Sequence, residues 1–517
     1  MRGGIVSESL VQKLVTEGIE LPASIIQRRI ESYSLHMDVG SVRIETPLHE
    51  MRIAAVARGA GPRTAVTPQA SFDAYLLHMA NKLGANQIKE KVTGLETSNG
   101  RPQVLTARGQ TEPYDLLVGA IGVNSKLHRS LDSLDGYRSP QRTKAYIAEF
   151  HLGKAMVERY MGDSMHVFLL DMKGVDFAAL IPKSDFVTLC LLGNDVNQAV
   201  VDQFLSKQVV QECLPPHWRI PKDFCHCSPQ MNVGPAIQPY RDRVVFIGDC
   251  GTTRLFKDGI GAAYRTAKAA AKTAVFHGIS AADFKDSFSP TCRSINADNR
   301  LGKVVFQATR QIQRRKFARR GLWRMTSREQ KLEGKQRLMS SVLWDTFTGS
   351  APYKSVFLRF LHPAFMGRFV WEIAAGVKQG ETVKPWERFA MASGATGLMG
   401  RKYNEGTVIY QQGDRGDCMY VIQSGSIEMI HRHGDQEYCV ATLGKGDFFS
   451  VSALFDEETR RFTMRVLEES YVFKMERNGL RSRLHEDPSM AFRLIQRMSA
   501  RLRDLEELLI QQAPGHT

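Results

Sequence analysis

The sequence of 517 residues is 43% hydrophobic and 24% charged, an ordinary globular mixture that excludes a collagen-like, a fully disordered or a disulfide-scaffold protein. At about 100–200 residues per domain, this length predicts two to four domains. Lys and Arg outnumber Asp and Glu by 69 to 54, but residues 301–340 alone hold twelve basic and two acidic side chains, so the excess of +15 reflects mainly one basic segment. No run of 18 uncharged apolar residues occurs, and no apolar stretch follows Arg2, so we expect a cytoplasmic protein without a transmembrane helix.

The first 150 residues have the pattern of a mixed α/β domain. Apolar side chains at helical spacing predict a helix over 71–85. Residues 114–120 (Tyr-Asp-Leu-Leu-Val-Gly-Ala) predict a buried strand that ends in a glycine turn, and the turn continues through Gly122 to Asn124 and Ser125.

Strand patterns continue through 143–240, for example over Phe186–Leu192. In this region Cys225 and Cys227 flank His226, and they are the only closely spaced pair among the eight cysteines. Because no second pair of ligands stands at zinc spacing, we expect reduced thiols and no metal site.

A second glycine turn follows the strand predicted over 243–248 (Arg-Val-Val-Phe-Ile-Gly). This turn contains Gly248-Asp249-Cys-Gly251, and Lys257-Asp-Gly259-Ile-Gly261 then opens a small-residue helix over about 261–275. Each turn alone is a weak signal, because Gly-Asp after a strand is common and alanine-rich helices mostly serve packing.

The two turns together, one beginning at Gly119 and the other at Gly248, resemble the flavoprotein superfamily of aromatic hydroxylases and geranylgeranyl reductases. The resemblance covers residues 1–280 and implies an FAD-binding oxidoreductase domain. In that family the Gly-Asp carboxylate binds the ribityl chain, and the following helix directs its positive N-terminus at the flavin, where charge accumulates on reduction. Carried onto this sequence, the carboxylate is that of Asp249, and the glycines that allow close approach or mark the middle motif are Gly248, Gly259, Gly261, Gly119 and Gly122.

Three departures from that family limit the functional expectation. The family's opening strand, Gly-x-Gly-x-x-Gly turn and helix, which hold the pyrophosphate, are absent, so the expected fold is an α/β domain lacking its first βαβ unit. Either Met1 is an internal start, which we favour, or the domain is a pseudo-enzyme that has lost its dinucleotide site. Ile121 replaces the usual Asp of the middle motif. Apart from Phe177, residues 177–182 lack the large aromatic residues that geranylgeranyl reductases place beside their substrate, so the substrate and the catalytic residues stay unassigned.

Residues 281–395 are expected to form a helical connector that contains the basic segment, 310–331. Nine Lys and Arg lie between Arg310 and Lys331, interleaved with Phe317, Leu322 and Trp323. A basic amphipathic helix of this kind suits peripheral contact with a membrane surface or with nucleic acid phosphate. The alternative is a solvated helix, or one that pairs with acidic residues of the neighbouring modules.

From residue 396 the pattern changes to short alternating strands with turn residues every 8–12 positions, which predicts an all-β roll up to about residue 476. Glycines such as Gly413, Gly416 and Gly425 stand where tight turns need a positive φ or a small residue. The order of these turns resembles the cyclic nucleotide-binding domain of catabolite-activator-type regulators and kinase regulatory subunits, over residues 400–510.

In that family, backbone N–H groups and a helix N-terminus hold the cyclic phosphate, one arginine pairs with it and one glutamate binds the ribose. The arginine position is occupied by Arg460, followed by Thr463. The glycine and glutamate of the family's Phe-Gly-Glu are replaced by Ser450 and Val451, and Ser452 and Ala453 come next. Without the carboxylate the ribose half of the site is damaged, so two alternatives stand: a cyclic nucleotide site, or a β-roll kept as a structural or protein-contact module.

A closing helix is predicted over 488–511, with apolar residues spaced 4-3-4-3-4 from Ala491 to Leu509. This seam suits either packing on the β-roll or a homodimer contact. Only eight residues follow Leu509, so we expect no DNA-reading domain of the kind that follows this helix in regulators.

The sequence thus predicts an FAD-binding domain over 1–280, a basic connector over 281–395 and a cyclic nucleotide-binding-like domain over 396–511. We expect a flavin-dependent oxidoreductase, of monooxygenase or reductase type, that acts on a small-molecule substrate and is regulated by a cyclic nucleotide. One alternative is a cyclic nucleotide-binding regulator with a non-catalytic flavoprotein remnant. Another is a scaffold at the inner face of a membrane, led by the basic segment.

Overall fold

The chain folds into two compact units, one of Met1–Ser7 with Ala23–Gly397 and one of Glu8–Pro22 with Leu398–Thr517. The computed structural model describes residues 4–19, 21–46, 53–58, 71–132, 136–193, 196–219, 225–332, 336–378, 400–434, 436–452, 459–477, 491–492, 495–496, 498–500 and 502–503.

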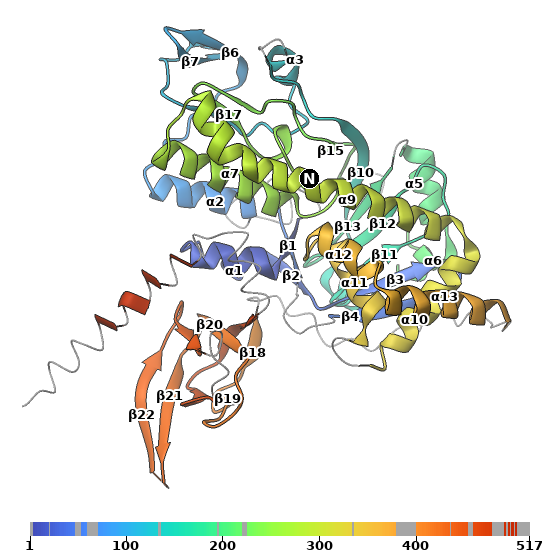
Figure 1. The fold of residues 1–517 in the computed structure, drawn as a ribbon. Coiled ribbons are helices and arrows are strands. Elements are labelled where there is room, and N and C mark those ends of the chain that lie inside the picture. Colours follow the sequence, from blue (N-terminus) through green and yellow to red (C-terminus); the bar gives the residue numbers. More distant parts are fainter. Residues whose placement is uncertain are drawn as a thin grey trace, which may run out of the picture. The chain divides into compact units, whose positions relative to one another are not determined.

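The first unit is built around an eight-stranded mixed sheet in the order β14-β10-β13-β12-β11-β3-β4, with β15 also paired to β10 (Figure 1). Its strands are β3 (Ser32–Met37), β4 (Gly40–Glu45), β10 (Arg142–His151), β11 (Ser164–Phe168), β12 (Phe177–Pro182), β13 (Phe186–Leu192), β14 (Cys225–Cys227) and β15 (Gln230–Asn232). Every residue of β12 and β13 is buried, which explains the pattern, apolar except for Thr188, that predicted a strand over Phe186–Leu192.

Helices cover both faces of this sheet. One face shares a core with α10 (Lys316–Glu329) and α11 (Leu338–Thr348), through residues such as Leu322 and Trp344. The opposite face shares a core with α4 (Lys154–Tyr160), α5 (Gln198–Leu205) and α6 (Gln208–Gln211), through residues such as Phe204.

Three smaller sheets complete the first unit. Their strands are β16 (Tyr240–Arg241), β17 (Val244–Phe246) and β9 (Leu117–Gly119); β6 (Val92–Ser98), β7 (Arg101–Thr106) and β8 (Gly109–Gln110); and β1 (Ile5–Ser7), β5 (Ile53–Val56) and β2 (Ile26–Ile30). The predicted strands near 114–120 and 243–248 are confirmed as β9 and β17. The predicted helices are confirmed as α2 (Phe72–Lys82), whose N-cap Ser71 accepts a hydrogen bond from the Ala74 N–H, and α7 (Gly259–Phe276).

The described residues of 281–378, from the segment expected as a separate connector over 281–395, belong to the first unit. Their elements are α8 (Ala281–Asp283), η3 (Phe284–Phe288), α9 (Ser289–Arg314), α10, α11, α12 (Tyr353–Phe360) and α13 (Pro363–Lys378). The physical reason is burial: Leu322 and Met325 of α10 are at most 1% exposed and belong to the same core as Tyr33 of the large sheet. Without that sheet, α10 would expose its apolar face to water.

Several cations of the basic segment pair with carboxylates of the first unit. The guanidinium of Arg319, which is 4% exposed, binds both carboxylate oxygens of Asp38 at 2.6 and 2.7 Å. Arg310 pairs with Asp176, and Glu372 of α13 receives both Arg324 and Arg328. Much of the positive charge in this segment is therefore balanced within the fold. This agrees with the alternative in which the basic helix pairs with acidic residues of the neighbouring modules.

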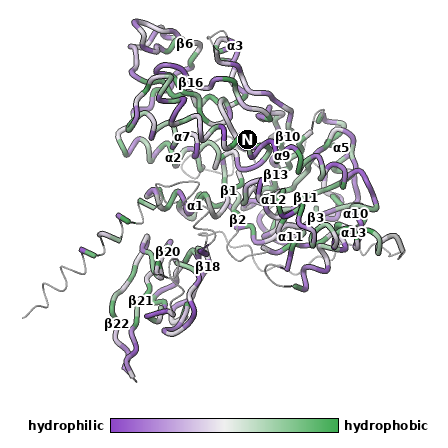
Figure 2. Tube along the Cα trace, viewed as in Figure 1, coloured by the Kyte–Doolittle hydropathy of each residue, from purple (hydrophilic) through white to green (hydrophobic). Residues whose placement is uncertain are grey.

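Hydrophobic and hydrophilic stretches alternate along the chain (Figure 2). In the described part of the chain, no helix combines the length and the apolar character needed to cross a membrane.

The second unit contains α1 (Glu8–Thr16) and a β-roll of two four-stranded sheets, β18-β25-β20-β23 and β19-β24-β21-β22 (Figure 1). The strands are β18 (Arg401–Tyr403), β19 (Val408–Tyr410), β20 (Cys418–Ser424), β21 (Ile427–His433), β22 (Gln436–Leu443), β23 (Phe448–Phe449), β24 (Thr463–Val466) and β25 (Ser470–Glu476). Gly413 and Gly425 have φ of +94° and +89°, so the predicted all-β roll has glycine where the turns require a left-handed backbone.

Candidate ligand-binding sites

The β-roll encloses a cavity of about 190 Å³ at the end of β23. It is lined by side chains from both sheets and from the segment before β24: Tyr410, Met429, Leu443, Phe448, Phe449, Ser450, Val451, Ser452, Thr459, Arg460, Arg461, Phe462 and Met464. Three of the five residues predicted for a cyclic nucleotide, Ser450, Ser452 and Arg460, thus meet at one cavity.

Arg460 is the cation of this cavity and is only 7% exposed. One terminal nitrogen of its guanidinium donates to the Cys418 carbonyl at 3.0 Å, and the other donates to the Cys418 Sγ at 3.2 Å. Its plane lies over the Tyr410 ring, 4.4 Å from the centroid, and its Nε is buried without a hydrogen-bond partner.

No carboxylate in the described part of the chain neutralises Arg460. Burial raises the pKa of the Cys418 thiol, so this partner stays uncharged and offers no counter-charge. A buried cation is costly unless an anion pairs with it. The site therefore has the electrostatics of an anion receptor.

Ser450 has a left-handed backbone with φ +61°, which explains why glycine suits this position in the resembled family. Its hydroxyl is hydrogen-bonded to that of Tyr410, whose pKa burial raises to about 12. Within the described residues, the N–H groups of Ser450, Val451 and Ser452 donate no hydrogen bond. Successive free N–H groups around a left-handed residue form a concavity that binds anions.

The other two residues predicted for the nucleotide are placed differently. The Thr463 hydroxyl accepts a hydrogen bond from the Gln412 N–H at 2.9 Å and does not line the cavity. Ala453 lies outside the described residues. Sequence reasoning missed Tyr410 and Phe449, and the only signal for Tyr410 was its place in the strand after the Glu405-Gly406 turn.

The two glycine turns of the first unit meet in space, although Gly119 and Gly248 are far apart in the sequence. Strand β17 pairs with β9 in parallel, with Phe246 opposite Gly119, and the Ile247 N–H donates to the Gly119 carbonyl at 2.9 Å. A Cβ on Gly119 would stand 2.4 Å from the Phe246 ring, so packing alone already requires glycine there. Gly122 and Gly248 have φ of +66° and +63°.

Asp249 is half-buried in η2 (Gly248–Cys250), and its carboxylate has no hydrogen bond or ion pair among the described residues. A Cβ on Gly259, the first residue of α7, would stand 3.9 Å from its Oδ1, so the carboxylate lies at the start of that helix. A free carboxylate beside open glycine backbone fits a ligand that carries hydroxyl groups. Gly261 makes room for a neighbouring side chain and not for a ligand, because a Cβ there would stand 2.2 Å from the Asp258 carboxylate.

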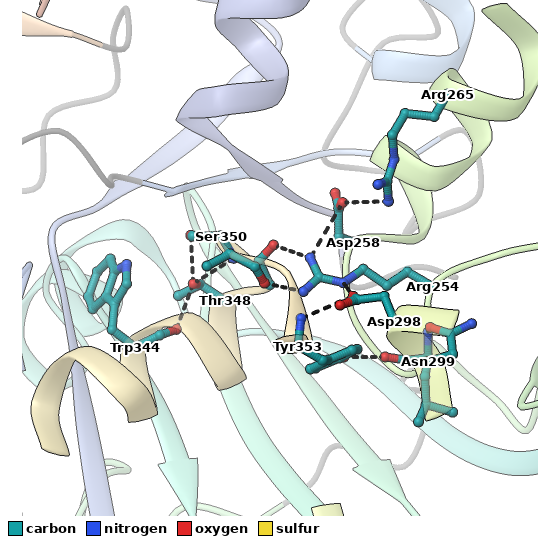
Figure 3. A network of polar contacts seen from close by, with 12 residues as sticks. Arg254, Asp258, Arg265, Asp298, Asn299, Trp344, Thr348, Ser350 and Tyr353 are labelled. Atoms are coloured by element: carbon teal, nitrogen blue, oxygen red, sulfur yellow. Dashed lines mark hydrogen bonds and ion pairs between the residues drawn. The ribbon is translucent and has the colours of Figure 1, made fainter. Parts of the chain in front are cut away.

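The loop between η2 and α7 is held by a buried arginine (Figure 3). Arg254 is 6% exposed, lies over the Tyr353 ring at 4.5 Å, and forms ion pairs with Asp258 and Asp298 at 3.9 and 3.8 Å. Its terminal nitrogens donate to the carbonyls of Gly349 and Ala351 after α11. This network fixes the loop that precedes α7.

Lys257, in the same loop, is a functional candidate that sequence reasoning missed. Its ammonium lies 3.4 Å from the Phe177 ring centroid and 5.9 Å from that of Phe347. Burial lowers the pKa of this lysine to about 8. No pattern in the sequence marks the position, because the two aromatic rings come from distant elements.

The remaining predicted features are placed as follows. His226 of β14 stacks on Tyr146, with centroids 5.8 Å apart, and the side chain of Cys225 lies outside the described residues. Much of the closing helix predicted over 488–511 also lies outside them, and of its seam Ile495, Met498 and Leu502 are exposed.

The β-roll and its buried arginine define the second unit as a domain of the cyclic nucleotide-binding type. Residues 400–487 match the family described as cyclic nucleotide-binding domain. The cyclic AMP receptor protein of Thermus thermophilus is 30% identical over 107 residues, which are 20% of this chain and 50% of that protein. The CRP-like cAMP-activated global transcriptional regulator of Mycobacterium tuberculosis is 28% identical over 146 residues, which are 27% of this chain and 63% of that protein.

Among solved structures, the Thermus thermophilus catabolite activator protein shares 29% identity, with a TM-score of 0.20, over 22% of this chain and 53% of that one. The lysophospholipase nte1 of Emericella nidulans is 28% identical over 117 residues, 22% of this chain and 8% of that protein. The chain spans about half the length of the bacterial relatives that it matches.

Proposed function

We propose that the β-roll binds a cyclic nucleotide, with the cyclic phosphate against Arg460 and the free N–H groups of Ser450–Ser452. The buried Arg460 guanidinium, which has no carboxylate partner among the described residues, carries this proposal. The relatives named for cyclic AMP support the class of ligand. Val451 supplies no carboxylate for a ribose hydroxyl, so the phosphate contributes most of the binding free energy.

The test is a calorimetric titration of the full chain with cAMP and cGMP. Arg460→Gln is expected to weaken binding at least 100-fold, because hydrogen bonds to charged groups contribute about 1.5–3 kcal/mol each. Arg401→Gln is the matched control: Arg401 lies on β18, outside the cavity, and its loss leaves the affinity unchanged. A wild-type chain that binds neither nucleotide refutes the proposal.

We also propose that the first unit binds FAD and works as an oxidoreductase. Two observations support this second function: the Asp249 carboxylate has no polar partner among the residues that the structure describes, and the glycine turns are joined by β9 and β17. The bound flavin supplies the redox chemistry, while Asp249 holds a ribityl hydroxyl and the Arg254 network keeps the loop before α7 in place.

The visible absorption spectrum of the purified chain tests this proposal, before and after addition of FAD and gel filtration. A retained flavin band that is weakened in Asp249→Ala is expected. Asp242→Ala is the control, because Asp242 caps the Ala281 N–H away from the glycine turns. A colourless chain that still binds cyclic nucleotide favours the alternative of a regulator with a non-catalytic flavoprotein remnant.

The two proposals combine into regulation, in which a nucleotide on the β-roll changes the activity of the first unit. Such coupling requires that the nucleotide has different affinities for two states of the chain. Turnover of reduced flavin with and without cAMP measures this coupling. If turnover is unchanged while the nucleotide is bound, regulation is refuted and the two binding proposals still stand.

A further inference from the structure

A second cluster of chemically active side chains lies inside the first unit, on the face of the large sheet that packs against α5 and α6. It consists of His36 on β3, His166 on the neighbouring parallel strand β11, and Cys213, which follows α6. All three are 0% exposed. The Asp249 carboxylate and the two glycine turns lie beside another sheet, β16-β17-β9, so this cluster is separate from the proposed flavin site.

The three possible ligand atoms converge. His36 Nε2 lies 2.9 Å from His166 Nδ1 and 3.6 Å from the Cys213 Sγ, and the two rings stack with centroids 5.1 Å apart. All three ligand atoms lie within 4.8 Å of one another. In the described part of the chain this is the one group of three or more His, Cys, Asp or Glu with such spacing.

These distances come close to those of a metal centre. Metal–N and metal–S bonds of about 2.1 and 2.3 Å at tetrahedral angles place two nitrogens about 3.4 Å apart, and a nitrogen and a sulfur about 3.6 Å apart. The nitrogen–sulfur distance therefore already fits. The nitrogens need to separate by about 0.5 Å when a metal ion replaces the proton that they share.

The outer ring nitrogens also have the partners that a metal site requires. His36 Nδ1 is 2.9 Å from the Ser41 hydroxyl, and His166 Nε2 is 3.4 Å from the Met161 carbonyl. A carbonyl at Nε2 fixes the tautomer of His166 whose Nδ1 carries a lone pair, and a hydroxyl can accept the Nδ1 proton of His36. Metal-bound histidines are held in this way by hydrogen bonds from the nitrogen that does not bind the metal.

We propose that His36, His166 and Cys213 bind one thiophilic transition-metal ion, Zn²⁺ or Cu⁺. Two imidazoles and a thiolate are ligands that both ions accept. Binding forms the metal–sulfur and two metal–nitrogen bonds and releases the Cys213 thiol proton to solvent. The proton between the two rings is given up from His36 Nε2, and His36 takes one up at Nδ1, where the Ser41 hydroxyl accepts it, so the net release is one proton and no oxidation state changes. Since the three ligands are buried and come from separate elements, the role of the site is to tie β3, β11 and the end of α6 together.

The test is elemental analysis of the full chain, purified without a metal-affinity tag from medium supplemented with zinc and, separately, with copper. About one ion per chain is expected in one arm, and the arm that fills identifies the ion. Cys213→Ser is expected to lose most of this metal. The matched control is Cys190→Ser, which removes another buried thiol of the same sheet and leaves the metal in place.

Cobalt gives a readout that does not depend on the variants. The wild-type chain prepared with Co²⁺ is expected to show a thiolate-to-cobalt charge-transfer band in the near ultraviolet, because sulfur binds the ion directly. A folded wild-type chain with less than about a tenth of an ion in both arms and no cobalt band overturns the proposal, as does equal metal loss in Cys190→Ser. The cluster is then a pair of core histidines that share a proton.

Discussion

At the scale of single residues, the second unit has an arginine where the resembled family binds the cyclic phosphate, but no carboxylate where that family binds the ribose. Arg460 is buried in the cavity, while Val451 stands where the resembled family has glutamate. The sequence predicted both points, because each depends on residue identity at a known place in a motif. It did not predict that Arg460 would bind the Cys418 carbonyl and stack on Tyr410, since those contacts depend on side-chain orientation.

Restoring the carboxylate is expected to strengthen nucleotide binding. Val451→Glu should raise the affinity for cAMP by about 10- to 100-fold, because a hydrogen bond to a charged group contributes about 1.5–3 kcal/mol. Calorimetric titration measures the gain. Val408→Glu adds the same charge at an exposed position outside the cavity, and an equal gain there would show that the effect is not due to a ribose contact.

Lys257 predicts a pH dependence of stability. Burial lowers its pKa to about 8 in the folded chain, against about 10.4 in the unfolded chain, so the unfolded state binds the proton more tightly. The folded state is therefore destabilised below pH 8 and regains stability as the pH rises from about 8 to about 10.4.

Lys257→Met should consequently be more stable than wild type at pH 7, by about 1–3 kcal/mol, and this gap should close towards pH 10. Urea unfolding across this pH range measures the gap. Lys303→Met, at an exposed position on α9, should show no such closure. A stability difference that does not change between pH 7 and 10 would contradict the lowered pKa of Lys257.

At the scale of elements, sequence patterns identified most strands and helices but not how distant elements pair. The apolar run of β13 and the small-residue pattern of α7 are local signals, so they were sufficient. The basic segment was ambiguous, because Asp38, the partner of Arg319, is 281 residues away. Without that partner a charged helix has the same pattern whether it faces lipid, nucleic acid or protein.

The paired arginines predict that removing one carboxylate destabilises the first unit. Asp38→Asn leaves the buried Arg319 guanidinium without a counter-charge and should lower the free energy of unfolding by about 2–4 kcal/mol. Arg320→Gln, the next residue of α10 and an exposed one, should change it by less than about 0.5 kcal/mol. Chemical denaturation compares the two variants. Equal losses of unfolding free energy would mean that the Asp38–Arg319 pair does not stabilise the first unit.

At the scale of the whole molecule, the sequence predicted a change of architecture near residue 396, and the second compact unit resumes at Leu398. The shift from long mixed patterns to short strands with regular turns made that boundary visible. The placement of the described residues of 281–378 in the first unit was not visible, since burial of α10 depends on a sheet built from residues between 32 and 232. The histidine–cysteine cluster was missed for a similar reason: Cys213 lies 177 residues from His36.

The central claim is that the β-roll holds a cyclic nucleotide against Arg460. Hydrogen–deuterium exchange of the full chain, with and without saturating cAMP, tests it most directly, because it locates the ligand without assuming a function. The account predicts slower exchange of the amides of Phe448–Ser452 and Arg460–Met464, and no such protection in Arg460→Gln. Unchanged exchange in both segments, or protection found only in the first unit, would contradict it.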